Sequence, residues 1–131
     1  MADNQLVIAN NDLVTVTENN GLSDILKPLI REIHLFDTYV AGTTYLKDKT
    51  VLEEIAVGEK LILQREDNKF DSNAILLFTD GKKKLGYIPE KDNIVFARLL
   101  DAGKILSAKV KDIQHRGTFT QISIGIYLVD L

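Results

Sequence analysis

Hydrophobic and polar positions alternate along six short runs in the last hundred residues of the chain. Alternation with a period of two predicts strands that are buried on one face. We therefore expect strands over 33–42, 60–65, 73–79, 82–88, 105–114 and 121–129. Asp80-Gly81, between the third and fourth runs, is typical of a hairpin turn that tolerates positive φ.

Two segments instead have helical patterns. Residues 90–102 predict a helix, with Gly103 as its C-terminal cap. Its expected buried stripe consists of Val95, Phe96, Leu99, Leu100 and Ala102. The sequence from Thr50 to Glu53 matches a capping box and predicts a short helical turn over 51–56.

The order of these elements predicts a mainly β, β-rich α+β domain. About six strands with one inserted helix and a short helical turn favour a small, partly open barrel. Residues 31–131 form this domain in our prediction. Residues 1–30 are polar apart from a short alternating run at 13–17, and we expect an N-terminal extension that is at most partly ordered.

Composition excludes several classes of protein. The chain has no cysteine, which rules out disulfides and thiolate zinc sites. It has no apolar run of about 18 residues and no secretory pattern, so we expect a cytoplasmic protein with no membrane partner. The formal net charge is −3, yet residues 82–116 carry nine basic and four acidic side chains, or +5. This asymmetry indicates a positive face or, alternatively, a solvated surface of mixed sign.

Catalytic and metal-binding patterns are missing from the sequence. His34 and His115 are far apart in the chain, and no phosphate-binding glycine motif or nucleophile motif occurs. We predict a protein that is not an enzyme and that uses no cofactor and no metal.

The most informative segment is a polar corner, residues 65–73, between two apolar strands. Asp71 and Asn73 have side chains that commonly hydrogen-bond nearby backbone, which is one explanation of the corner. Arg65 has a planar fork that suits either a carboxylate or a phosphate.

Three aromatic residues lie near basic strands. Tyr45 follows a bend, Tyr87 lies beside the basic run 82–84, and Phe119 shares the phase of the polar face of the last strand. Exposed rings of this kind stack on nucleic-acid bases for about 1–3 kcal/mol per base. The alternative is that these rings pack against the domain itself.

These segments together resemble the HIRAN domain family, over about residues 31–129 and in its free-standing bacterial type. The matching pieces are Tyr39-Val40-Ala41-Gly42 with Tyr45, the run from Leu63 to Ile75 that contains Phe70-Asp71-Ser72-Asn73-Ala74, and Leu85-Gly86-Tyr87-Ile88-Pro89. The resemblance implies a barrel related to OB and SH3-like folds. It also implies a nucleic-acid-binding module, since HIRAN domains attached to fork-remodelling helicases recognise single-stranded 3′ ends of DNA.

The resemblance assigns roles to individual residues. Tyr45 and Phe119 match stacking rings, and Asp71 matches the carboxylate that accepts the terminal 3′-hydroxyl. Weaker candidates for DNA contacts are Arg65, Lys69, Tyr87, Lys82 and Lys84. The chain departs from the family pattern at Leu46, where a second ring is usual, and at Thr44, where a basic residue is usual.

The expected partner is therefore single-stranded DNA, bound at its 3′ end. Two alternatives stay open. The domain is a protein-interaction adaptor that keeps the barrel without DNA affinity, or it is an accessory domain that works with a DNA-processing helicase or nuclease partner.

Overall fold

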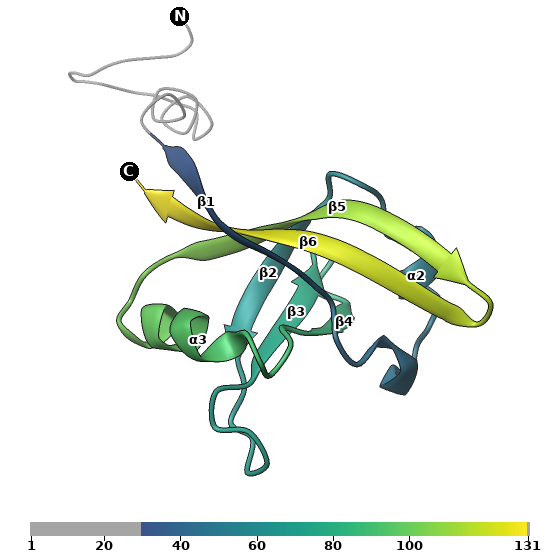
Figure 1. Ribbon diagram of the computed structural model, residues 1–131, viewed down its shortest axis with the longest axis horizontal. Helices are drawn as coiled ribbons and strands as arrows, with labels where there is room; N and C mark the ends of the chain where they lie inside the picture. The colour runs from purple at the N-terminus through teal and green to yellow at the C-terminus, as the bar shows by residue number, and fades with distance from the viewer. Residues whose placement is uncertain (1–29, 131) are drawn as a thin grey trace, which may run out of the picture. The chain divides into compact units, whose positions relative to one another are not determined.

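The computed structural model describes residues 30–130, which form one sheet of six strands. The strands follow the chain as β1 (Arg31–Tyr39), β2 (Lys60–Arg65), β3 (Ile75–Thr79), β4 (Lys84–Tyr87), β5 (Leu106–Arg116) and β6 (Phe119–Asp130). Their order in the sheet is β1-β6-β5-β2-β3-β4, as Figure 1 shows. The predicted six-stranded, mainly β fold is confirmed, while the extension predicted for residues 1–30 lies almost wholly outside the described residues.

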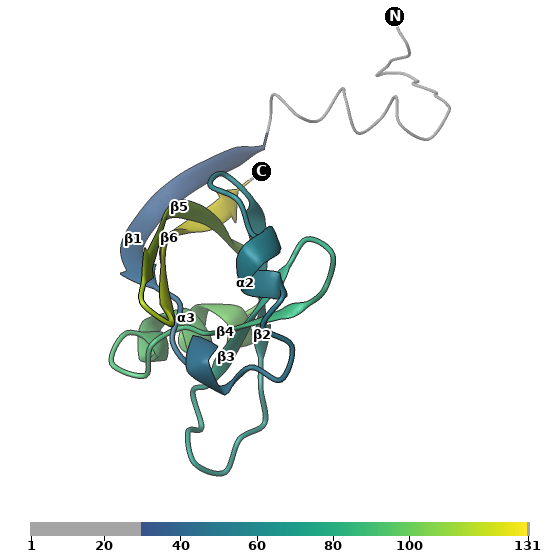
Figure 2. The same cartoon turned by 90° about the vertical axis from the view of Figure 1, so that its right-hand side faces the viewer.

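The sheet bends around a central core so that its two edge strands approach each other (Figure 2). Val40, just after β1, donates its N–H to the carbonyl of Ile122 in β6 at 2.9 Å. The next residue, Ala41, exchanges two hydrogen bonds of 2.8 and 2.9 Å with Tyr87 in β4. This single bridge joins the edges, and the sheet is otherwise not closed, as expected for a partly open barrel.

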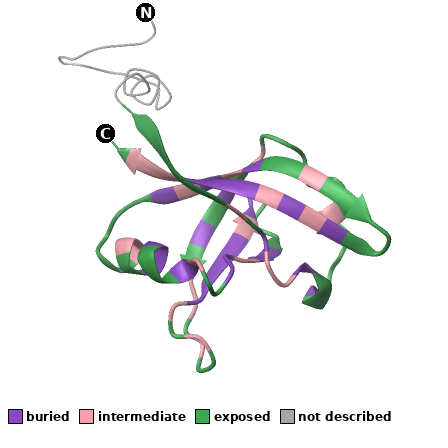
Figure 3. Cartoon of the chain, in the orientation of Figure 1, coloured by how far each residue is buried: buried purple, intermediate pink, exposed green. Residues whose placement is uncertain are grey.

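Most of the core comes from the strands, and α3 and the segments around η2 and α2 add to it (Figure 3). Leu61 and Leu63 alternate with exposed neighbours in β2. Leu106, Ala108 and Val110 alternate with the half-buried Ser107 and Lys109 in β5. Because these side chains occupy every second position, β2 and β5 each contribute one apolar face to the barrel interior. β1 and β3 depart from the alternation expected from the sequence, since β1 has no buried residue and four of the five residues of β3 are buried.

The main helix is shorter than predicted and faces the core differently. α3 (Asn93–Asp101) begins after the turn at Pro89, whose carbonyl accepts the N–H of Asp92 at 2.9 Å. Val95 was predicted to be buried but is 59% exposed, and the polar Asn93 is only 2% exposed. The predicted inner stripe is thus partly wrong. Phe96 is buried and Leu99 and Leu100 pack against the core as predicted, but Val95 and Ala102 are exposed and Ala97 is buried instead.

Two turns differ from their predictions. The capping box does not form, because the hydroxyl of Thr50 donates to the carboxylate of Asp48 at 2.5 Å rather than capping α2 (Val51–Glu54). In the β3–β4 hairpin, the positive φ lies at Lys82, with a φ of 66°, and not at Asp80-Gly81. The N–H of Lys82 bonds the carbonyl of Thr79, so the turn is one residue longer than a two-residue hairpin.

The helices of residues 30–130 are all too short or too polar to cross a membrane.

The bridge between the sheet edges requires a glycine in β4. A Cβ at Gly86 would lie 2.5 Å from the carbonyl oxygen of Ala41 and 2.6 Å from Cγ1 of Val40. The first of these is a backbone atom of the bridge itself, so it cannot move away without breaking the hydrogen bonds to Tyr87.

We predict that Gly86→Ala destabilises the domain by about 1–3 kcal/mol, since it overpacks the closure point. Urea unfolding followed by circular dichroism measures this change. Gly81→Ala is the matched control, because a Cβ there meets its nearest atom, Oγ1 of Thr79, at an ordinary 3.7 Å. Equal stabilities of the two variants would contradict this role of Gly86.

Candidate nucleic-acid interface

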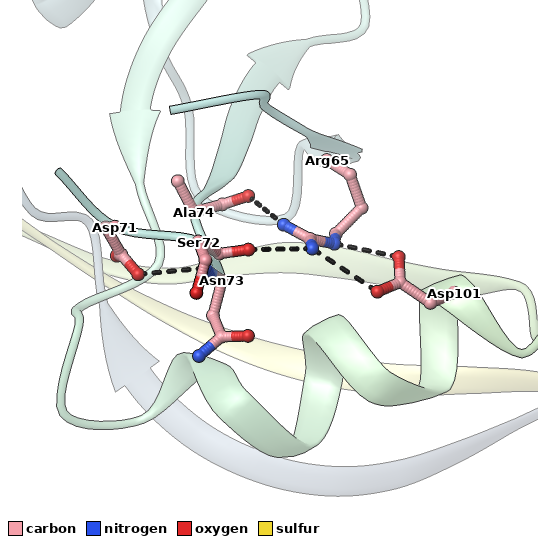
Figure 4. Close-up of polar contacts among 6 residues, drawn as sticks. All are labelled: Arg65, Asp71, Ser72, Asn73, Ala74 and Asp101. Carbon is pink, nitrogen blue, oxygen red and sulfur yellow. Dashed lines mark hydrogen bonds and ion pairs between the residues drawn. The ribbon is translucent and has the colours of Figure 1, made fainter. Parts of the chain in front are cut away.

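Arg65, the last residue of β2, holds the polar corner together (Figure 4). Its guanidinium donates to the carbonyls of Ala74 and Ser72 at 2.8 and 2.9 Å. It also forms a two-pronged contact with the carboxylate of Asp101 in α3, at 2.9 and 3.3 Å. Arg65 therefore ties both ends of the corner to the end of α3.

The ion pair between Arg65 and Asp101 shifts the pKa values of both side chains. The hydrogen bond from Arg65 holds the pKa of Asp101 below its usual range, and Asp101 raises the pKa of Arg65. Asp101 is well exposed, with a side chain 55% accessible, so solvent screens the pair. Arg65 also contributes through the carbonyl of Ser72 and through that of Ala74, which in addition accepts the N–H of Glu66 at 3.0 Å.

Asp71 is fixed from two directions within the corner. One carboxylate oxygen accepts the N–H of Asn73 at 2.9 Å, and the other accepts the side-chain amide of Asn93 at 2.9 Å. Each carboxylate oxygen has a second lone pair, so Asp71 can accept further hydrogen bonds. The side chain is only half-buried, which leaves it open to a ligand.

Asn93 is a positioning residue that the sequence analysis missed. It is buried at the first position of α3, and the sequence analysis gave this position no role. No local pattern identifies it, because its partner Asp71 lies 22 residues earlier in the chain.

Phe70 is a second omission. Its ring is 85% exposed in the corner, immediately before Asp71, and Nζ of Lys69 lies 5.2 Å from the ring centroid. Its N–H donates to the side-chain oxygen of Asn68 at 2.8 Å, which fixes the backbone beneath the ring. The signal that could have identified it is a large apolar residue inside a charged, turn-prone run.

Tyr45 projects from the short helical turn η2 (Thr43–Tyr45), which follows the left-handed Gly42. Its ring is 88% exposed, in agreement with the expectation that it points outward. Leu46 is 8% exposed and belongs to the core. The position where the family usually has a second ring is therefore turned inward in this chain.

A groove lies beside Tyr45, with a volume of about 460 Å³. Its remaining lining residues are Leu46, Lys47, Asp48, Val51, Lys83 and Lys84. The structure thus brings Tyr45 and Lys84, both predicted from the sequence, to one site. It adds Lys47 and Lys83, which the sequence analysis did not single out.

Tyr87 connects this groove to the corner. Its hydroxyl donates to the carboxylate of Glu66 at 2.9 and 3.0 Å, and Nζ of Lys84 lies 5.0 Å from its ring centroid. The side chain is half-buried, so much of the ring packs against the domain.

The two remaining predicted residues lie outside these clusters. Phe119 is 41% exposed at the start of β6 and does not line the groove. Lys82 is exposed in the β3–β4 hairpin, in the left-handed conformation described above. Non-glycine residues in that conformation cost about 1–3 kcal/mol, which the surrounding hairpin must offset.

Comparisons with known proteins agree with this geometry. A protein from Lactobacillus plantarum has a solved structure with a TM-score of 0.72 and 29% identity, over 78% of this chain and 99% of that one. The HIRAN domain of human HLTF has a TM-score of 0.61 and 16% identity, over 76% of this chain and 78% of that one, and shows a shared fold. No curated protein sequence gives a match.

The HIRAN domain family model matches residues 33–129, which are most of the chain and include every residue of the corner and the groove. HIRAN domains are binding domains, known as DNA-binding modules. The chain therefore belongs to the HIRAN domain family.

Proposed function

We propose that this domain is a non-catalytic module that binds single-stranded DNA and selects its 3′ end. The observation that carries the proposal is the setting of Asp71. Its carboxylate is held by Asn73 and the buried Asn93, it keeps unused lone pairs, and the exposed ring of Phe70 adjoins it.

Electrostatics give this carboxylate its selectivity. A carboxylate repels the phosphates of a DNA strand unless a hydroxyl donates a hydrogen bond to it. The terminal 3′-hydroxyl supplies such a donor, whereas a 3′-phosphate or an internal linkage supplies only negative charge. Asp71 therefore confers selection of the end and not general affinity.

Exposed rings and lysines supply the affinity. Tyr45, Phe70 and Phe119 present faces on which bases stack, for about 1–3 kcal/mol each. Lys69, beside Phe70, and Lys84, beside Tyr87, are placed to contact backbone phosphates. Lys82 and the edge of Tyr87 are further contacts in this proposal.

Arg65 has a positioning role in the proposal. Four of the hydrogen bonds that its guanidinium can donate already go to Ser72, Ala74 and Asp101, so it shapes the corner that carries Asp71. Only one of its five N–H donors, on Nη1, is left for a phosphate, so a two-pronged phosphate contact would require it to give up one of these bonds.

A second candidate function, protein interaction, is favoured by the apolar side chains of β1. Ile33, Leu35 and Phe36 are 43%, 37% and 40% exposed on this strand. Exposed apolar side chains gathered on one strand are typical of a surface that meets another protein. A DNA-processing protein is the partner that suits a HIRAN domain.

Asp71→Asn tests the end-reading role. We predict that the parent binds an oligonucleotide with a free 3′-hydroxyl at least about tenfold more tightly than its 3′-phosphorylated form, and that Asp71→Asn narrows this ratio to about twofold. Asparagine keeps the bonds to Asn73 and Asn93, because the Asn93 amide can turn to accept. Fluorescence anisotropy measures both affinities.

Asp67→Asn is the matched control, since Asp67 is an exposed carboxylate in the same loop. The control should leave the ratio unchanged. An Asp71→Asn protein with the parental ratio would exclude the role of Asp71, and a parent that binds neither oligonucleotide would favour the protein-interaction function.

Arg65→Gln separates positioning from phosphate binding. We expect thermal unfolding to show a loss of about 1–3 kcal/mol, because the hydrogen bonds from the guanidinium to the carbonyls of Ser72 and Ala74 are lost, while the salt dependence of DNA binding keeps its slope. Asp101→Asn removes only the ion pair and should cost less. A salt slope that falls by about one in Arg65→Gln would show a direct phosphate contact instead.

A further inference from the structure

The groove beside Tyr45 is separate from the corner that holds Asp71. No residue of the corner is among its lining side chains, which come from the segment around η2 and α2 and from the β3–β4 hairpin. Leu46 and Val51 are buried core residues and form its apolar floor. Its rim carries the ring of Tyr45 and the ammonium groups of the lysines.

The two carboxylates near the groove are both engaged. Asp48 accepts the N–H and the hydroxyl of Thr50 at 3.0 and 2.5 Å, and these bonds, the hydroxyl's first, hold its pKa below the usual range. Glu54 accepts from Nζ of Lys83 at 2.9 Å and raises the pKa of that lysine. The lining therefore presents three lysines against one aspartate whose oxygen already has partners.

The lysines are able to change partners at little cost. Lys83 and Glu54 form an exposed pair, with side chains 50% and 59% accessible, and such pairs contribute little to stability. A phosphate that replaces Glu54 as the partner of Lys83 keeps the ammonium paired. Lys84 adds a second cation beside Tyr87.

We infer that this groove is a second subsite, which binds the backbone of the DNA strand on the 5′ side of the nucleotides read at the 3′ end. The inference rests on the proposed function, which places the terminal hydroxyl at Asp71. The strand then passes the ring of Tyr45 and enters the groove, where Lys47, Lys83 and Lys84 contact successive phosphates.

The combination of side chains favours a polynucleotide over other occupants. An aromatic ring on the rim of a basic groove is the arrangement that binds single strands without regard to sequence, because bases stack while cations follow the backbone. The volume of about 460 Å³ is within the range of sites for small ligands, and the groove is open at the surface, which suits a strand that passes through it.

The test uses the full chain with two probes, a thymidine dinucleotide and a thymidine hexanucleotide, each with a free 3′-hydroxyl. We expect the hexanucleotide to bind more tightly. In the double variant Lys47→Ala/Lys83→Ala, its Kd should rise about tenfold and its salt slope fall by about one, while the Kd of the dinucleotide stays within about twofold.

Lys49→Ala/Lys104→Ala is the matched control, because it removes the same charge from exposed lysines outside the groove. Equal effects of the two double variants, or equal weakening of both probes, would overturn the subsite. If the parent nevertheless prefers a 3′-hydroxyl over a 3′-phosphate, the assignment of the groove is wrong and the proposed function still stands. If the parent binds neither probe, the proposed function fails with it.

Discussion

The pair of hydrogen bonds between Ala41 and Tyr87 is the constraint on which the rest of this domain depends. It joins the two edges of the sheet at one point, and the absence of a side chain at Gly86 makes that approach possible. Because η2 begins directly after this bridge, the exposed ring of Tyr45 is held beside the lysines of the β3–β4 hairpin. Closure of the barrel and assembly of the groove therefore depend on the same pair of hydrogen bonds.

The polar corner is the second structural device, and it explains why charged residues separate two buried strands. Arg65 donates to the carbonyl of Ser72 and adds a second donor to that of Ala74, which also accepts the N–H of Glu66. Asn93 supplies a further donor from inside the domain, to Asp71. Lys69, Phe70 and the unused lone pairs of Asp71 remain available to a ligand, so one loop serves both folding and the proposed recognition.

The sequence predicted β2 and β5 well because their alternating positions show the buried face directly. The bounds of β2 were correct to the residue, and the other strands differed by a few residues at their ends. The buried face of α3 was harder to predict, because its short apolar pattern fits more than one face of a helix. Val95 was assigned to the buried face but is exposed. The family resemblance supplied the architecture that alternation alone leaves open.

The candidate site was predictable only in part. Tyr45 could be placed outside the core from its position after a bend, and Asp71 could be singled out from its motif. The contacts of Arg65 with Asp101 and of Asp71 with Asn93 span 36 and 22 residues, and local patterns carry no information about them. The same holds for Lys47, which joins Lys83 and Lys84 only through the folding of η2 onto the hairpin.

The central claim is that the domain recognises how a single strand ends. The most direct measurement compares the affinities of the unmodified protein for a linear oligonucleotide and for the same sequence closed into a single-stranded circle. Both molecules offer the same bases and nearly the same charge, but the circle has no terminal hydroxyl. We predict that the linear strand binds distinctly more tightly than the circle. Equal affinities would contradict selection of the 3′ end.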